Sequence, residues 1–287
     1  MEDIRIIDEK YIRENLRKRS REGHKGTYGR DLIFAGSPGM AGAAALCAKS
    51  ALRSGAGTVS CLIESFNSPM LNILQCAVPE ATCVEAALDM DLEKYNAIGC
   101  GPGLGNKPGA VEVLHYISGN YSGDLVLDAD ALNIISSDSS LAEAVKNSNA
   151  AKIMTPHIGE ARRLLKTAAK LDSESERLSA ARDISAKYNS IVVLKSFETL
   201  IVSSADPDII YKNITGNPGM ATGGSGDVLT GVITALCGQG HSPLHSAAMG
   251  VYIHAAAGDL AAGRLGEIGM ISSDISSFLP EAFKKFC

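Results

Sequence analysis

The sequence lacks the features of a membrane or secreted protein. No uninterrupted apolar stretch approaches the roughly 20 residues that a membrane-spanning helix requires. The first twenty-five residues are too rich in charge for a signal peptide. The chain has an odd number of cysteines and no Cys-x-x-Cys pair, a pattern that favours free buried thiols over a disulfide framework. These absences predict a cytoplasmic protein that is not embedded in a membrane.

An excess of positive charge is also missing. The formal net charge is -5 and the isoelectric point is near 5.7, so no overall positive field attracts nucleic acid. The basic run from Arg13 to Lys25 is interpreted as a solvated helix face. Nothing in the composition suggests a nucleic-acid partner.

Two common nucleotide-binding motifs are absent. No Gly-Lys-Ser or Gly-Lys-Thr triplet occurs, which disfavours a P-loop enzyme. The glycines of Gly101 to Gly105 have the wrong spacing for a dinucleotide fingerprint, which disfavours a Rossmann dehydrogenase.

What the sequence does contain is an alternation of short apolar strands and helices. With 287 residues, 45% hydrophobic content and no linker, repeat or low-complexity segment, it predicts one α/β domain spanning residues 1–287. Residues 1–24 read as an N-terminal extension that packs on the main body. Expected strands are residues 32–35, 58–63, 96–100, 124–128, 152–155 and 191–195. Expected helices are residues 40–54, 67–76, 108–118, 160–169, 173–189, 227–236, 243–262 and 272–286.

The expected sheet is mainly parallel, with helices on both faces. Residues 199–203 and 209–212, joined by a turn around Pro207, predict a hairpin that adds antiparallel strands at one edge. Pro280 is expected to interrupt the last helix because proline lacks the N–H that a helix interior needs.

A glycine-rich loop near the C-terminal third is the strongest local signal. Residues Gly216 to Asp227 contain five glycines in twelve positions and lead directly into an apolar helix. Bare backbone N–H groups at a helix N-terminus form an anion cradle. Asp227 then either takes a proton from a hydroxyl that attacks a phosphate or simply caps the helix.

Three other glycine-marked or polar segments follow predicted strands, at residues 36–42, 101–105 and 155–160. Ligands of open α/β sheets bind at the carboxyl ends of the strands. The four segments together therefore predict a site for phosphate and hydroxyl chemistry at that edge.

The chain resembles the ADP/ATP-dependent NAD(P)H-hydrate dehydratases of the ribokinase-like superfamily over nearly its whole length. The segments that carry the resemblance are His24 to Gly29, Gly39 to Ala44, Gly101 to Gly105, Asp128 to Asn133, Thr155 to His157 and Gly216 to Gly231.

This resemblance implies ADP-dependent dehydration of the S epimer of hydrated NADH or NADPH. The ring hydroxyl is phosphorylated and phosphate is then eliminated, which returns the reduced cofactor with AMP and phosphate. It also implies Mg²⁺, a preference for ADP over ATP and a homo-oligomer, expected to be a tetramer. Because the chain lacks the additional epimerase domain that some family members carry, a separate hydrate epimerase is the expected partner.

The resemblance assigns roles to individual residues. Asp227 is the expected general base, and it shares the hydrate pocket with Ala43, Gly105 and His157. The expected nucleotide-binding residues are Lys195, Ser196, Phe197, Glu198, Thr199, Gly223, Gly224, Ser225 and Gly226. The family usually has Lys-Gly-x-x-Thr at the first of these segments, so Ser196 and Glu198 depart from its pattern.

Other roles are left open by the sequence. Glu160 is a candidate to organise magnesium through water, or it only favours the helix dipole. Asp128 and Asp130 either orient substrate and metal-bound water or satisfy backbone groups at a strand end. Two other functions use the same loop: an ATP-dependent kinase of a small hydroxylated vitamin precursor, such as hydroxyethylthiazole or hydroxymethylpyrimidine, and a non-catalytic nucleotide-sensing module.

Overall fold

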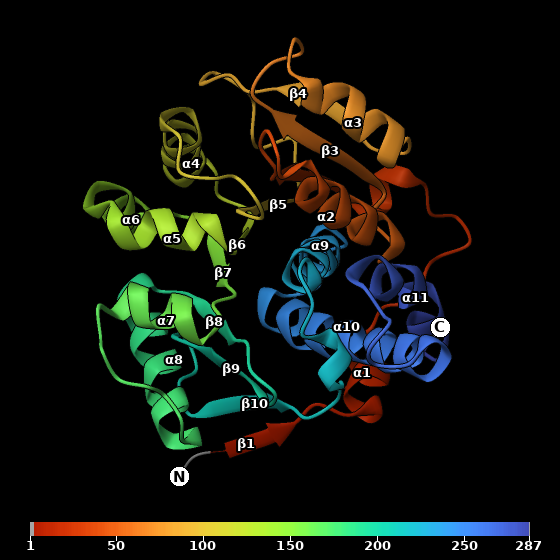
Figure 1. Cartoon of the computed structure of the whole chain (residues 1–287), viewed down its shortest axis with the longest axis vertical. Helices are drawn as coiled ribbons and strands as arrows, with labels where there is room; N and C mark the ends of the chain where they lie inside the picture. The colour runs from red at the N-terminus through yellow and green to blue at the C-terminus, as the bar shows by residue number, and fades with distance from the viewer. Residues whose placement is uncertain (1–2, 287) are drawn as a thin grey trace.

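A computed structural model describes residues 3–286 of the chain (Figure 1). Its strands form one ten-stranded sheet. Neighbouring strands pair in parallel, except that β9 runs antiparallel to β8 and to β10. The order across the sheet is β1 (Asp3–Ile6), β10 (Ile209–Asn213), β9 (Thr199–Ser203), β8 (Ile191–Leu194), β7 (Ala151–Met154), β6 (Asp124–Leu127), β5 (Ala97–Cys100), β2 (Arg30–Phe34), β3 (Thr58–Ile63) and β4 (Thr82–Glu85).

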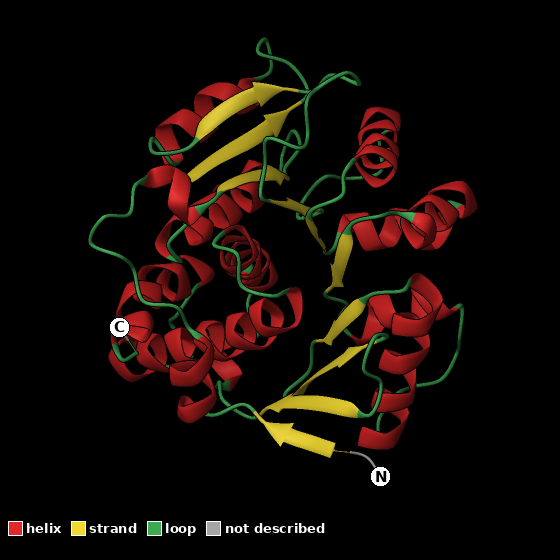
Figure 2. Ribbon diagram, turned by 180° about the vertical axis from the view of Figure 1, so that it is seen from behind, coloured by secondary structure: helices red, strands yellow, loops and turns green. Residues whose placement is uncertain are grey.

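Helices cover both faces of this sheet, as Figure 2 shows from behind. One face carries α4 (Pro108–Asn120), α5 (Asp130–Ser137), α6 (Ser139–Asn147), α7 (Ile158–Leu165) and α8 (Glu174–Tyr188). The other carries α1 (Glu9–Asn15), α2 (Ala41–Arg53), α3 (Pro69–Ala77), α9 (Ser225–Gly238), α10 (Pro243–Leu265) and α11 (Ser272–Lys284). Among residues 3–286, no helix combines the length and the apolar character that crossing a membrane demands.

Alternation along the strands divides the core between the two faces. In β6, Leu125 and Leu127 pack under α4 to α8, whereas Val126 packs against the layer that contains α9 and α10. Successive side chains of a strand point to opposite faces, so a strand buried on both faces is apolar throughout. This is the physical reason that the strand signal in the sequence is a continuous apolar run.

The mainly parallel sheet, the helices on both faces and the antiparallel hairpin are confirmed. The hairpin of β9 and β10 lies one strand inside the edge, because β1 pairs in parallel with β10. Strand β4 and the helices α5 and α6 were not predicted. The helix expected at residues 160–169 spans Ile158–Leu165 instead.

The predicted interruption at Pro280 is wrong. Helix α11 continues through this residue to Lys284. Pro280 is exposed, while its neighbours Leu279 and Ala282 are buried in the core beside α10. One lost backbone hydrogen bond is offset here by the burial of the helix's apolar side.

Helix α9 lies at the centre of the molecule and approaches α2 very closely at Gly231. A Cβ atom at this position would lie 2.1 Å from the Cys47 carbonyl oxygen and 2.2 Å from Ser50 Oγ. Only glycine permits this approach. The contact sets how closely α9 packs against α2.

We predict that Gly231→Ala lowers the free energy of unfolding by about 1–3 kcal/mol, because the added methyl must push α9 away from α2. The control is Gly263→Ala in α10, where an added Cβ meets no atom within 4 Å. That substitution should raise stability by about 0.5–1 kcal/mol, since glycine is costly inside a helix. Urea denaturation measures both, and equal effects would show that the α2–α9 contact is not tight.

Candidate active site

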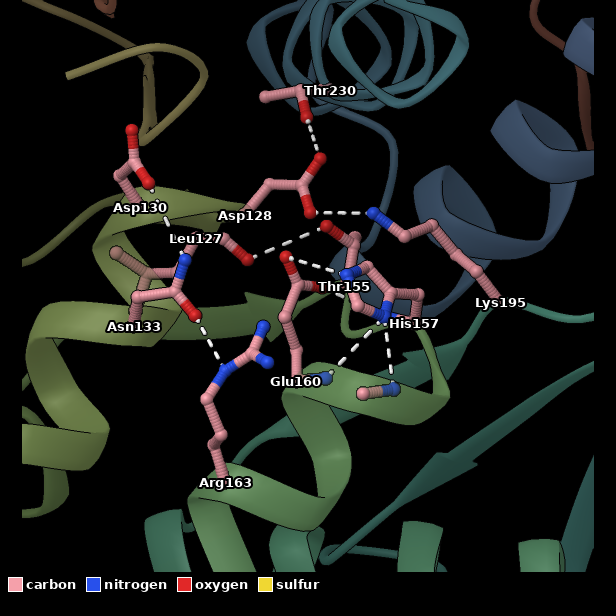
Figure 3. Close-up of polar contacts among 11 residues, drawn as sticks. Leu127, Asp128, Asp130, Asn133, Thr155, His157, Glu160, Arg163, Lys195 and Thr230 are labelled. Atoms are coloured by element: carbon pink, nitrogen blue, oxygen red, sulfur yellow. Dashed lines mark hydrogen bonds and ion pairs between the residues drawn. The ribbon is translucent and has the colours of Figure 1, made fainter. Parts of the chain in front are cut away.

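The carboxyl ends of β6, β7 and β8 meet the start of α9 at a cluster of polar side chains (Figure 3). Asp128 follows β6, Thr155 follows β7 and Lys195 follows β8. A Cβ placed on Gly226, in the first turn of α9, would lie 3.3 Å from Lys195 Nζ and 3.4 Å from Asp128 Oδ2. The predicted glycine loop and the predicted strand ends are therefore in contact.

Asp128 connects three of these elements through an ion pair and a hydrogen bond. Its carboxylate is 1% exposed. Lys195 Nζ lies 2.6 Å from Oδ1, and Thr230 Oγ1 donates to Oδ2 at 2.8 Å. Because a buried charge requires an opposite charge and hydrogen bonds, these partners allow the carboxylate to remain buried. The network joins β6, β8 and α9.

The backbone between Asp128 and Asp130 takes an unusual turn. Ala129 has φ 49° and ψ -117°, a conformation that L-residues with a side chain rarely adopt. Strain of this kind collects at functional sites. After this turn Asp130 Oδ2 accepts a 2.8 Å hydrogen bond from the backbone N–H of Gly105, so the loop 101–105 is held at the same site.

Asp227 lies in the first turn of α9 and is half-buried. Burial raises its pKa to about 6; the charges of Asp128 and Asp130 add to this effect, and Lys195 opposes it. Gly224 occupies the cap position of α9, which has no side-chain cap hydrogen bond, so Asp227 is not the cap. The N-cap alternative for Asp227 is therefore excluded, and the acid–base role stays a prediction.

His157 and Glu160 form a capping box at the start of α7. His157 Nδ1 accepts from the backbone N–H of Gly159 at 2.9 Å, and Glu160 Oε2 accepts from the backbone N–H of His157 at 2.8 Å. Burial and then Lys195 lower the pKa of His157. Burial raises the pKa of Glu160, which Lys195 opposes. Both residues thus act as helix caps and also face the Lys195 side of the site.

The segment Lys195 to Thr199 connects β8 to β9. Ser196 Oγ donates to the Glu198 carbonyl oxygen at 2.6 Å, which closes the turn that a glycine would otherwise make. The Glu198 carboxylate lies 2.8 Å from Lys212 Nζ, so its additional charge is paired within the protein. Phe197 is 80% exposed, with the Arg177 guanidinium 5.2 Å from its ring centroid.

The glycine loop is anchored by residues that the sequence did not reveal. The Asp259 carboxylate accepts from the Gly216 N–H at 3.1 Å and from Asn217 Nδ2 at 2.9 Å. Ser272 Oγ donates to the Gly223 carbonyl oxygen at 2.7 Å. Ser225 Oγ lies 3.4 Å from Nε2 of His254, whose pKa burial lowers to about 4. The only signal for Asp259 and His254 was that both interrupt an apolar helix.

Ala43 lies in the first turn of α2, and Gly105 lies in the loop between β5 and α4. A Cβ on Gly103 would lie 2.8 Å from Ala43 Cβ, and one on Gly105 would lie 3.8 Å from Ser37 Oγ. The hydrogen bond from Gly105 to Asp130 then connects the loop of Gly105 to the acids around Asp227. Within residues 3–286, no group of three or more His, Cys, Asp or Glu side chains could hold a metal ion by itself.

This fold and this site define a ribokinase-like protein, with a glycine-rich loop and an acid at the N-terminus of one helix. A crystal structure of a ribokinase-like superfamily protein from Enterococcus faecalis superposes with a TM-score of 0.83 at 26% identity, and the match covers 99% of this chain and 96% of that one. A hydroxyethylthiazole kinase from Pyrococcus horikoshii shares the fold, with a TM-score of 0.61 at 12% identity, over 91% of this chain and 92% of that one.

The chain belongs to the NAD(P)H-hydrate dehydratase family, whose family model matches residues 32–281. A bifunctional NAD(P)H-hydrate repair enzyme from Moorella thermoacetica is 39% identical over 96% of this chain; the chain spans only 53% of that relative's length. An ADP-dependent (S)-NAD(P)H-hydrate dehydratase from Neisseria meningitidis is 38% identical, over 91% of this chain and 87% of its own length. The structure of the Bacillus subtilis ADP/ATP-dependent dehydratase, co-crystallised with ATP and Mg²⁺, has a TM-score of 0.84 at 30% identity and 98% coverage of both chains.

We predict that Thr230→Val lowers the free energy of unfolding by about 1.5–3 kcal/mol, because it removes a hydrogen bond to a buried carboxylate. Thr234→Val is the matched control, since the Thr234 hydroxyl donates only to the Thr230 carbonyl oxygen, 2.8 Å away in the same helix. Thr234→Val should lower the free energy of unfolding by no more than about 1 kcal/mol. Thermal and urea denaturation measure both variants. Equal stability of the Thr230 and Thr234 variants would contradict the expected contribution of the Thr230–Asp128 hydrogen bond.

Proposed function

We propose that this protein is an ADP-dependent hydro-lyase that converts the S epimer of hydrated NADH or NADPH back to the reduced cofactor, releasing AMP and phosphate. Family membership and the activities named for its relatives support the reaction. The observation that carries the proposal is Asp227, a half-buried acid with a pKa near 6 in the first turn of a glycine-preceded helix.

The chemical problem is a poor leaving group. Hydroxide leaves the hydrated ring with difficulty, whereas phosphate leaves readily. In the proposed first step, Asp227 accepts the proton of the ring hydroxyl. The hydroxyl oxygen attacks the β-phosphorus of ADP, and AMP departs. In the second step, the ring nitrogen expels phosphate, a proton leaves the adjacent ring carbon, and the dihydropyridine is restored.

The backbone around Asp227 suits the transferring phosphoryl group. The N–H groups of Gly223, Gly224, Ser225 and Gly226 lie at the positive end of α9, where they stabilise negative charge. Lys195 Nζ is held close to Gly226 by Asp128 and adds a positive charge there. We assign these groups to the phosphates of ADP.

The remaining contacts follow from their positions around this centre. We propose that Ala43 contacts the hydrate from the first turn of α2, Gly105 from the loop beside Asp130, and His157 from the start of α7. The segment Lys195, Ser196, Phe197, Glu198 and Thr199 is proposed to bind the rest of ADP. The ion pair between Glu198 and Lys212 supports this role, because it keeps the Glu198 charge away from the phosphates.

The acidic residues fit a magnesium ion that is coordinated mainly by the phosphates of ADP and by water, with few direct protein ligands. Mg²⁺ usually keeps several waters and is held by one or two carboxylates together with substrate phosphates. Glu160 and Asp128 already accept hydrogen bonds or ion pairs from the protein, so we assign Glu160 to contact through water. When bound, Mg²⁺ supplies charge neutralisation at the phosphates.

We further propose a cytoplasmic enzyme that assembles as a homo-oligomer, with a tetramer as the expected state. The six cysteines of the described residues are all free thiols, in keeping with a reducing compartment. We take residues 1–287 as one domain, with residues 1–24 as an extension whose strand β1 pairs with β10. The bifunctional relatives support functional pairing with a hydrate epimerase.

We predict that the protein restores dihydronicotinamide absorbance from hydrated NADH or NADPH when ADP and Mg²⁺ are supplied. Asp227→Asn should lower kcat by roughly 10²–10⁴-fold, because a general base is lost, while ADP binding measured by calorimetry is retained. No recovery with ADP or with ATP would refute the proposal. A stable phosphorylated small molecule as product would indicate the kinase, and unchanged turnover by Asp227→Asn would remove this residue's catalytic role.

The pH dependence provides a separate prediction. Asp227 must be ionised to accept a proton, so kcat/KM for the hydrate should fall tenfold per pH unit below about pH 6. Asp128→Asn removes a negative charge that raises the pKa of Asp227, so the acidic limb should move to lower pH. Lys195→Met removes a positive charge that lowers the pKa of Asp227, so the pH at which kcat/KM begins to fall should rise. Profiles at saturating ADP test this; shifts in the same direction would contradict it.

A further inference from the structure

A pocket of about 250 Å³ lies beside the active site, at the carboxyl ends of β2 and β3. Its other walls come from α3, α4 and the loop after β4. We call it the β2–β3 pocket. The buried side chains Phe34, Leu62, Leu104 and Val113 contribute its apolar lining, and Ala87 is an exposed residue of its wall.

The β2–β3 pocket shares a wall with the loop that carries Gly105. Ser37 lines the pocket, and its hydroxyl donates to the Gly103 carbonyl oxygen at 2.9 Å. The same hydroxyl would lie 3.8 Å from a Cβ on Gly105, whose N–H donates to Asp130. A ligand that extends from the acids past Gly105 therefore reaches the pocket at Ser37. The Lys195 to Thr199 segment, which we assign to ADP, follows a different strand, β8.

The size and charge of the pocket restrict its occupant. Complete small-molecule sites usually have volumes of roughly 300–1,000 Å³, so this pocket suits one end of a larger ligand. An apolar lining suits the faces of a flat ring, and the carboxylates of Glu64 and Glu112 suit an exocyclic amine. Lys107, two residues after Gly105, adds a positive charge for a diphosphate.

We infer that the β2–β3 pocket binds the adenine end of the dinucleotide hydrate. The inference rests on the proposed function, which places the nicotinamide end at Asp227 and leaves the adenosine half to extend past Gly105. Binding energy from this remote half then contributes to positioning the ring hydroxyl. A mononucleotide that lacks the adenosine half cannot use the pocket.

The test compares two substrates, hydrated NADH and hydrated reduced nicotinamide mononucleotide. In the wild-type protein, kcat/KM for the dinucleotide should be higher by about tenfold or more, equivalent to roughly 1.4 kcal/mol. Two pocket-filling variants, Ala110→Phe and Ala87→Trp, should lower the dinucleotide value by about tenfold. They should leave the mononucleotide value and the KM for ADP within about twofold of wild type. Ala169→Trp, at an exposed alanine in the loop after α7, is the matched control and should change none of these.

Three results would overturn the inference: equal wild-type values for both substrates, equal loss for both in the variants, or a selective rise in the KM for ADP, which would place the nucleotide's base in the pocket. Calorimetric binding of NADH makes the test independent of turnover. If the wild-type protein dehydrates neither hydrate, the proposed function fails, and a loss of NADH affinity confined to the pocket variants still supports the pocket assignment. Unchanged NADH affinity in both variants counts against it. Thermal denaturation confirms that the variants are folded.

Discussion

The ion pair between Lys195 and the buried carboxylate of Asp128 is the interaction on which the site depends. Lys195 Nζ lies 2.6 Å from Asp128 Oδ1, and a second contact to this carboxylate, from Thr230, joins the two strand ends to the helix that carries Asp227. Removing one partner of such a buried pair leaves an uncompensated charge, which is far more costly than the loss of a surface ion pair. The arrangement therefore couples the stability of the fold to the geometry of the site. It also brings a positive charge beside Gly226, where phosphate is expected.

The same environment sets the properties of Asp227. An exposed aspartate is ionised well below neutral pH and is a weak base, whereas burial and neighbouring carboxylates raise the pKa of Asp227 to about 6. The strained turn at Ala129 brings Asp128 and Asp130 to the site, and the close contact at Gly231 positions α9. The pKa of Asp227 thus depends on burial and on charged residues from other elements.

Most of the architecture was accessible from the sequence because most of the parallel strands are apolar runs that are followed by a glycine turn or a helix. The failures have physical causes. Strand β4 has four residues, with its ends exposed, and carries little apolar signal. Helix α5 contains β-branched residues and serines that are weak helix formers. At Pro280 tertiary packing overrides a local rule, since the buried side of α11 outweighs one missing hydrogen bond.

By itself the sequence determined the fold class, the glycine loop and the family, because these are recorded in local periodicity and in contiguous motifs. It left two roles open for Asp128, in orienting substrate and metal-bound water or in satisfying backbone groups at a strand end. Only the tertiary structure showed the partners of the Asp128 carboxylate, Lys195 and Thr230, since Thr230 lies 102 residues away in the sequence. The anchors of the glycine loop at Asp259 and Ser272, and the pocket beside Gly105, were also beyond the sequence. Burial and distance, which set charge energies, exist only once the chain is folded.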